Sequence, residues 1–124
     1  MNWEFIPDRP IYTQILEQLE IEIVAGRYRP GERLPSVREL AEEASVNPNT
    51  MQRAMADLEQ RGMATGYRTS GRFVTEDTEV IRQARDRLLR EKLEDFSRSM
   101  EQLGVSPNEI KELLYQWVKE NEKS

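Results

Sequence analysis

The stretch SVRELAEEASVNPNTMQRAM, residues 36–55, decides the fold because it holds two helical patterns with a break between them. Ser36 followed by Glu39 is an S-x-x-E capping box, which predicts that a helix begins here. The apolar positions of that helix are Val37, Leu40, Ala41 and Ala44. Pro48 suits the first position of a helix but not its interior, and Asn47 before it is a good cap. The sequence therefore predicts one helix that ends near Ala44 and another that begins at Pro48.

The helix predicted from Pro48 to Gly62 has an apolar face and a polar face. The apolar positions are Met51, Ala54, Met55 and Leu58, which share one side of a helix. The polar side carries Asn49, Gln52, Arg53, Ala56 and Gln60. Asn and Gln bind adenine N6 and N7, and Arg binds guanine O6 and N7, so this side is suited to reading base edges. Asn47 and Thr50 at the helix start are suited to phosphate oxygens. The alternative is a face that contacts only solvent.

The segment before this stretch predicts a further helix. Its apolar positions, spaced along one helical face, are Tyr12, Ile15, Leu16, Leu19 and Ile23. We expect Asp8 to cap this helix and Gly26 to end it. A turn at Pro30–Gly31 then leaves Arg33–Leu34 as a short extended piece before Pro35.

After Gly62 the composition becomes typical of strands. Residues 63–68 and 72–75 flank a turn at residues 69–71, which predicts a β-hairpin with glycine in its turn. The order of helix, helix, tight turn, helix and hairpin is that of a winged helix-turn-helix. We therefore expect residues 1–75 to form a winged helix-turn-helix domain that binds DNA.

Three arginines outside the helix at Pro48 support that function. Arg38 lies in the first turn after Ser36, and Arg68 and Arg72 flank the hairpin turn. In a winged helix these positions face the duplex, where guanidinium groups bind phosphates or the minor groove. Each one alone is accounted for by a solvated surface charge, but the three are expected on one side of the domain.

The remaining residues, 76–124, predict two charged helices with narrow apolar seams. The first seam is Leu89, Leu93, Phe96, Met100 and Leu103, with the spacing of a coiled coil. After Gly104, Ser106 and Glu109 form a second capping box around Pro107. The last helix carries Ile110, Leu113, Leu114, Trp117 and Val118 on one face. Because a complete small domain precedes these helices, a second subunit is the natural cover for their seams. We expect a homodimer held by Leu89, Leu93, Phe96, Met100, Leu103, Leu114 and Trp117. The fold class is thus mainly α with a small β-hairpin.

The composition of the 124 residues argues against an enzyme. There is no cysteine and no histidine, which removes thiol chemistry, imidazole bases and the commonest zinc ligands. The glycines form no phosphate-binding loop, so we expect neither cofactor nor metal. The N-terminus lacks the pattern of a signal peptide, and no apolar run approaches the roughly 18 residues of a membrane span. These features indicate a cytoplasmic protein, and no effector site is marked.

The charge balance leaves a second interpretation open. The net charge is −5, which suits a winged-helix adaptor that binds a partner protein rather than specific DNA. Residues 29–75, however, contain seven arginines against six acidic residues, so the acidity lies in the flanks. Salt-sensitive, sequence-dependent binding to promoter DNA would exclude the adaptor.

Residues 10–74 resemble the GntR family of bacterial transcription regulators. The motifs that carry the resemblance are PGERLPSVRELA (30–41), NTMQRAMADLEQRG (49–62) and SGRFV (70–74). The short helical tail together with VNPNT (46–50) is similar to the YtrA-type subfamily. The resemblance implies a homodimeric repressor of a palindromic operator, without a large effector domain. It assigns DNA contacts to Ser36, Arg38, Asn47, Asn49, Thr50, Gln52 and Gly71, with Arg53 and Arg72 as helpers.

The chain also departs from the family pattern. Many relatives have a basic residue where this chain has Pro48, and another where it has Gln52. The wing pattern G-x-G-T-F-V appears as TSGRFV, so Thr69 and Arg72 stand in place of glycine and threonine. The operator sequence therefore does not transfer from relatives.

Overall fold

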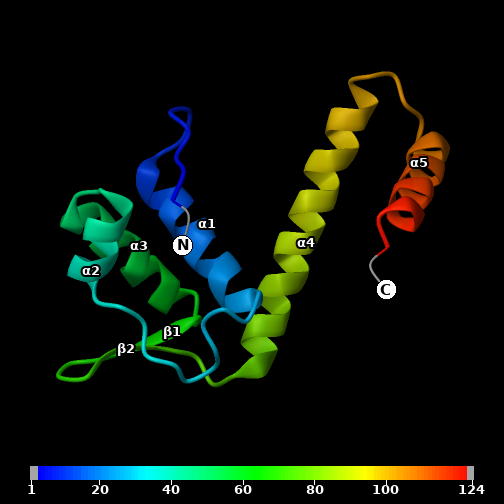
Figure 1. Cartoon of the computed structure of the whole chain (residues 1–124). Helices are drawn as coiled ribbons and strands as arrows, with labels where there is room; N and C mark the ends of the chain where they lie inside the picture. The colour runs from blue at the N-terminus through cyan, green and yellow to red at the C-terminus, as the bar shows by residue number, and fades with distance from the viewer. Residues whose placement is uncertain (1–2, 123–124) are drawn as a thin grey trace. The chain divides into compact units, whose positions relative to one another are not determined.

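Within residues 3–122, the part of the chain that the computed structural model describes, five helices and two strands follow one another. They are α1 (Ile11–Val24), α2 (Val37–Ala44), α3 (Pro48–Gln60), β1 (Ala64–Tyr67), β2 (Gly71–Val74), α4 (Thr78–Glu101) and α5 (Pro107–Glu120) (Figure 1). The chain divides into two compact units, one up to Arg85 and one from Asp86 onward. The predicted class, mainly α with a small β-hairpin, is confirmed.

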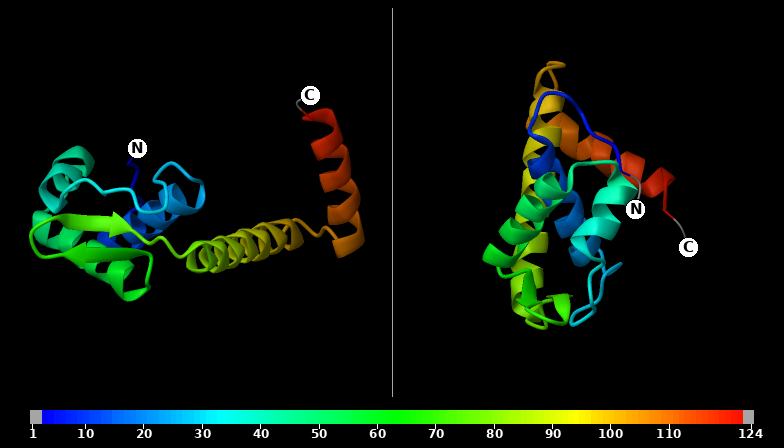
Figure 2. Two further views of the ribbon diagram at one scale, coloured as in Figure 1. Left: turned by 90° about the horizontal axis from the view of Figure 1, so that it is seen from below. Right: turned by 90° about the vertical axis from the view of Figure 1, so that its left-hand side faces the viewer.

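The core of the first unit lies between α1, α2 and α3, with the hairpin at one end of the three helices (Figures 1 and 2). The side chains without exposed surface come from the predicted apolar faces: Ile15, Leu19, Leu40, Met51, Ala54, Met55 and Leu58. Burial of one such side chain stabilises a fold by about 1.5–3 kcal/mol, so these positions hold each helix in one rotation. The rotation of α3 decides which of its residues face outward.

The break between α2 and α3 is built as the sequence predicts. The Ser36 hydroxyl accepts a hydrogen bond from the Glu39 amide over 3.1 Å, and the Glu39 carboxylate accepts one from the Ser36 amide over 3.3 Å. Asn47 caps α3 through its side chain, which accepts from the Asn49 amide over 2.8 Å, and Pro48 is the first helical residue. Between the caps, Ser45 has a φ of +57°, a left-handed conformation that ends α2.

The predicted cap of α1 is wrong. The helix begins at Ile11 after Pro10, and no side chain caps it, so Asp8 has no such role. The preceding segment is held instead by the amide of Gln14, which is 7% exposed. That amide accepts from the Ile6 backbone and donates to the Ile6 and Arg9 carbonyls, each over 2.9 Å. These bonds hold residues 6–9 against α1 without capping the helix. Gly26, with a φ of +81°, follows the end of the helix as predicted.

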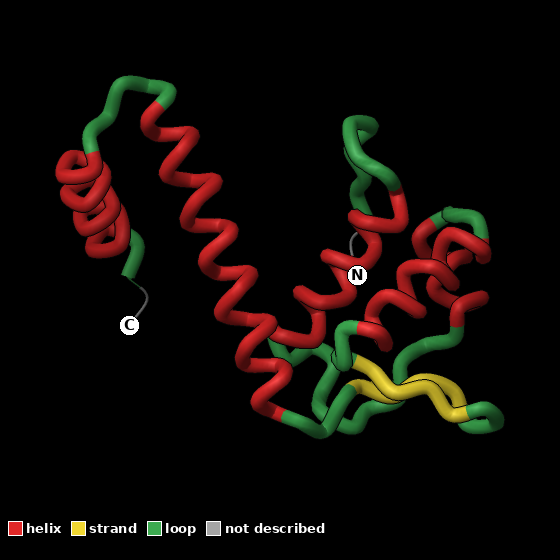
Figure 3. Tube along the Cα trace, turned by 180° about the vertical axis from the view of Figure 1, so that it is seen from behind, coloured by secondary structure: helices red, strands yellow, loops and turns green. Residues whose placement is uncertain are grey.

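Strands β1 and β2 form the antiparallel hairpin of the wing (Figure 3). Ala64 lies opposite Val74 and Gly66 lies opposite Arg72. The extended piece predicted at Arg33 and Leu34 adds a short third edge: Arg33 bridges Phe73, and the Leu34 amide donates to the Arg72 carbonyl over 2.9 Å. The Arg33–Leu34 segment therefore connects the start of α2 to strand β2 of the hairpin.

The first turns of α4 belong to the first unit. Val80, Ile81 and Ala84 pack against its core, which is why that unit extends to Arg85, past the end of the hairpin. In the second unit, Ser106 accepts from the Glu109 amide over 3.2 Å, which is one half of the predicted second capping box. Among the helices in residues 3–122, none combines the length and the apolar character needed to cross a membrane.

Candidate nucleic-acid interface

The outward face of α3 is the first component of the candidate site. Its four apolar positions are almost wholly buried, which turns the opposite side to solvent. The side chains exposed there are Asn49, Gln52, Arg53, Ala56 and Gln60. These are the residues whose polarity suits base edges, and the fold of this chain leaves them uncovered.

The start of α3 presents hydrogen-bond donors. The exposed Asn47 accepts from the Asn49 amide through its side-chain oxygen, and its NH₂ group has two further donors. Thr50, one residue further, is half-buried. The positive end of the helix dipole adds to these donors, which suits an anionic oxygen.

Arg53 is exposed but is not without a partner. Its guanidinium carbon lies 3.6 Å from the ring centroid of Tyr12 on α1. A cation stacked on an aromatic face is attracted by the ring quadrupole and keeps its full charge. Tyr12 thus orients Arg53 on one flank of the α3 face, a contact that sequence reasoning missed because Tyr12 reads simply as an apolar position.

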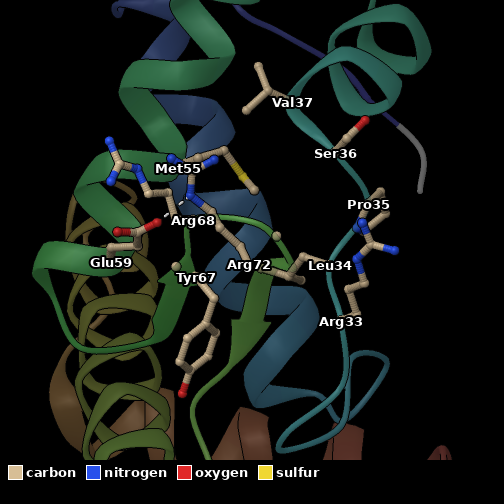
Figure 4. Close-up of a pocket in the computed structure, with 12 residues that line it drawn as sticks. Arg33, Leu34, Pro35, Ser36, Val37, Met55, Glu59, Tyr67, Arg68 and Arg72 are labelled. Carbon is tan, nitrogen blue, oxygen red and sulfur yellow. Dashed lines mark hydrogen bonds and ion pairs between the residues drawn. The ribbon is translucent and has the colours of Figure 1, made fainter.

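A cavity of about 420 Å³ lies between the start of α2, the second half of α3 and the hairpin (Figure 4). Three arginines line it, Arg33, Arg68 and Arg72, together with one carboxylate, that of Glu59. The cavity brings together four residues of the predicted DNA-binding set: Ser36, Arg68, Gly71 and Arg72. The predicted residues of α3, 47–53, do not line it and lie along the helix instead.

Arg33 is a candidate that sequence reasoning missed. Its side chain lies against Gly71, where an added Cβ would be 3.1 Å from the Arg33 Nε. Gly71 also has a φ of +97°, which L side chains rarely adopt, so the backbone conformation favours glycine there. The signal in the sequence was the place of Arg33 in the extended piece before Pro35 and the α2 cap.

The arginines of the first unit fall into two groups. Five of them pair with carboxylates: Arg9, Arg27, Arg61, Arg72 and Arg82. Within the described residues, the other six form no ion pair and are exposed: Arg29, Arg33, Arg38, Arg53, Arg68 and Arg85. Arg38 is on α2, as predicted. Arg68 was expected to flank a turn at residues 69–71 but lies in the turn itself, because β1 ends at Tyr67 and β2 begins at Gly71. Guanidinium groups that are not neutralised internally retain their charge for phosphates.

Arg72, predicted to contact DNA, has a carboxylate partner within the protein. It is half-buried, and its Nε donates to the Glu59 Oε1 of α3. The dashed line in Figure 4 marks this pair. A carboxylate partner neutralises Arg72, in contrast with the aromatic partner of Arg53.

The described residues hold no arrangement suited to catalysis by a metal. No group of three or more carboxylate, histidine or cysteine side chains gathers in residues 3–122 where it could hold an ion. The candidate site is therefore a surface of donors and positive charges around one exposed helix face.

Comparisons with known proteins agree with this chemistry. The model of the family described as "Bacterial regulatory proteins, gntR family" matches residues 11–74. The HTH-type transcriptional regulator YhcF of Bacillus subtilis strain 168 is 39% identical over 112 residues, 90% of this chain and 93% of YhcF. The HTH-type transcriptional repressor YtrA of the same organism is 33% identical over 112 residues, 90% of this chain and 83% of YtrA.

Solved structures extend the likeness to the fold. A GntR family transcriptional regulator from Listeria monocytogenes superposes with a TM-score of 0.81 at 39% identity, covering 95% of this chain and all of that one. The DNA-binding domain of AraR, solved in complex with its operator ORX1, has a TM-score of 0.57 at 25% identity over 60% of this chain and 96% of that one.

The fold and the surface around α3 define a winged helix-turn-helix DNA-binding regulator, and the relatives are transcriptional regulators rather than enzymes. The chain belongs to the GntR family. Its likeness to YtrA runs along most of both chains, so the resemblance to the YtrA-type subfamily is confirmed.

Proposed function

We propose that the chain is a cytoplasmic repressor that binds a palindromic operator as a homodimer. The observation that carries the proposal is the outward face of α3, polar and uncovered, together with exposed arginines that form no ion pair within residues 3–122, among them Arg33, Arg38, Arg53 and Arg68. The names of YtrA, a repressor, and of the AraR–operator complex support it.

In this proposal α3 enters the major groove. Asn49, Gln52 and Arg53 read base edges, and Asn47, Thr50 and Ser36 bind phosphates near the starts of α3 and α2. Arg38 binds the backbone beside α3, and the hairpin turn with Arg68 and Gly71 reaches the neighbouring minor groove or backbone. Arg33, which lines the same cavity as Arg68, joins this set of phosphate contacts.

The second unit supplies the proposed dimer contact. None of the described α5 residues is buried, and the side chains of Leu93 and Trp117 are each 61% exposed. An apolar groove of about 410 Å³ is lined by Phe96, Met100, Leu113, Leu114 and Trp117. Leu89 and Leu103 are also exposed, at 48% and 78%. Exposed apolar surface of this kind marks an interface, and a second copy covers it with the same seam. Two reading helices would then lie about 34–36 Å apart, or a small multiple of that.

The test is fluorescence anisotropy with the promoter DNA of the chain's own operon at rising salt. We expect a Kd of about 10⁻⁸ M or tighter for a specific site, and a steep loss of affinity with salt. Equal, weak binding to promoter and unrelated DNA would contradict the proposal and favour the protein-binding adaptor.

A further inference from the structure

Glu59 is the acidic residue of the cavity that three arginines line. It lies on α3 at the flank of the outward face, one helical turn after the buried Met55. A carboxylate in such a place repels DNA phosphates unless a cationic group balances its charge. The contacts of Glu59 identify that cationic group.

Two contacts fix the Glu59 carboxylate against the hairpin. Arg72 donates its Nε–H to the Glu59 Oε1, with side chains 20% and 34% exposed, respectively. Gly66, directly opposite Arg72 in the hairpin, leaves the space that the carboxylate fills: a Cβ on Gly66 would be 2.5 Å from the Glu59 Oε1 and 3.1 Å from its Cδ. Directly opposed residues of an antiparallel pair face the same side, so Arg72 and Gly66 meet Glu59 together.

We propose that Glu59 is a positioning residue, which withdraws Arg72 from DNA phosphates and holds the hairpin against α3. The inference rests on the proposed DNA-binding function. Phosphate contacts add affinity for any sequence, whereas base contacts discriminate. An arginine neutralised inside the protein therefore lowers affinity for every duplex and leaves discrimination to Asn49 and Gln52.

The pairing also separates Arg72 from its neighbours. Arg33 and Arg68 line the same cavity without an ion pair in the described residues, so they keep their charge for phosphates. Partial burial strengthens the pair of Arg72 and Glu59, because screening by water and salt is weaker there. A phosphate that approaches Arg72 therefore meets a guanidinium whose charge Glu59 already balances.

The test uses anisotropy of the full chain with a labelled duplex of mixed sequence across a series of NaCl concentrations. We expect Glu59→Gln to steepen the slope of log K against log[salt] by about 0.9, the value of one extra phosphate contact. The affinity gained over wild type then grows by about eightfold for each tenfold fall in salt. The double variant Glu59→Gln/Arg72→Gln should return to the wild-type slope.

Asp57→Asn is the matched control. The substitution removes one negative charge, as Glu59→Gln does, but Asp57 lies on the other flank of the α3 face. An unchanged slope in Glu59→Gln, an equal rise in Asp57→Asn, or a rise that persists in the double variant would each overturn the proposal. A DNA-free readout is the Arg72 Nε–H NMR signal, expected to be protected from exchange in wild type and unprotected in Glu59→Gln; no difference would overturn the pairing. Failure of wild type to bind any duplex at low salt would instead overturn the DNA-binding function.

Discussion

At the scale of single residues, the contact partner of an arginine decides whether its positive charge remains available to bind phosphates. Arg53 lies over the Tyr12 ring, and Arg72 pairs with the Glu59 carboxylate. The ring orients a charge without cancelling it, whereas the carboxylate cancels it. Both arginines were predicted to serve DNA, and the sequence offers no means of telling them apart, because neither partner is a close neighbour along the chain.

Arg38 and Gln52 separate the two kinds of DNA contact. We expect Arg38→Ala to weaken binding to all duplexes and to reduce the slope of log K against log[salt] by about 0.9, because one phosphate contact is lost.

We expect Gln52→Ala to weaken binding to the preferred site by about 1–3 kcal/mol and to relax preference at particular bases, with the slope of log K against log[salt] unchanged. Anisotropy titrations against the operator and its single-base variants measure both. Unchanged operator affinity in Arg38→Ala at physiological salt would contradict the docking.

The stacking of Arg53 on Tyr12 is measurable without DNA. We expect a double-mutant cycle with Tyr12→Leu and Arg53→Gln to give a coupling of about 0.5–1 kcal/mol in the free energy of unfolding from urea titrations. Tyr12→Phe serves as the control, because it keeps the ring and should keep most of the coupling. Strictly additive effects of the two changes would mean that the contact contributes nothing.

At the scale of elements, the turn between α2 and α3 sets the angle between these two helices. The turn combines two side-chain caps with the left-handed Ser45. The caps satisfy backbone amides at both helix starts, while Ser45 adopts a conformation that usually takes glycine. The turn is thus stabilised at its caps and strained at one residue.

Ser45→Gly tests that strain. A non-glycine residue in this conformation costs about 1–2 kcal/mol of stability, which glycine avoids. Glycine also loses more chain entropy on folding, which offsets about 0.4–1 kcal/mol of that gain. We therefore expect a net gain of about 0.5–1 kcal/mol in the free energy of unfolding, measured by urea denaturation. Ser45→Ala keeps a Cβ and should show no gain; equal stability of both variants would refute the strain.

At the scale of the whole molecule, the first unit carries the winged helix-turn-helix fold, and the second unit carries the proposed dimer contact. The first unit buries the apolar positions of α1, α2 and α3, whereas the described part of α5 buries none of its residues. A chain that exposes Leu93 and Trp117 this far leaves apolar surface for another molecule.

Leu93→Glu tests the dimer. We expect the variant to be a monomer at micromolar concentration by sedimentation velocity, because a charge in the seam stays unpaired and desolvated in a dimer. Its operator affinity should fall, since two linked heads bind more tightly than one. Lys92→Glu, which changes charge at a neighbouring position outside the seam, should remain dimeric. A strictly monomeric wild type would contradict the role assigned to the seam.

Local patterns in the sequence were sufficient to predict the order of elements. The capping box at Ser36, the proline restart at Pro48 and the apolar spacing of α1 and α3 all involve residues a few positions apart. Hydrogen bonding and burial within one or two helical turns decide such features, so they can be read from sequence. The outward face of α3 follows directly from which of its residues are buried.

Tertiary structure alone decided which charges remain available on that face. Arg72 and Glu59 are 13 residues apart, and the space at Gly66 that admits the carboxylate exists only once hairpin and helix have packed. The hydrogen bonds of Gln14 to the Ile6 backbone and the contact of Arg33 with Gly71 arise in the same way. The physical reason is that the spacing of residues along the chain determines which face of a helix or strand a side chain occupies. The residue that it contacts there depends on which elements pack together.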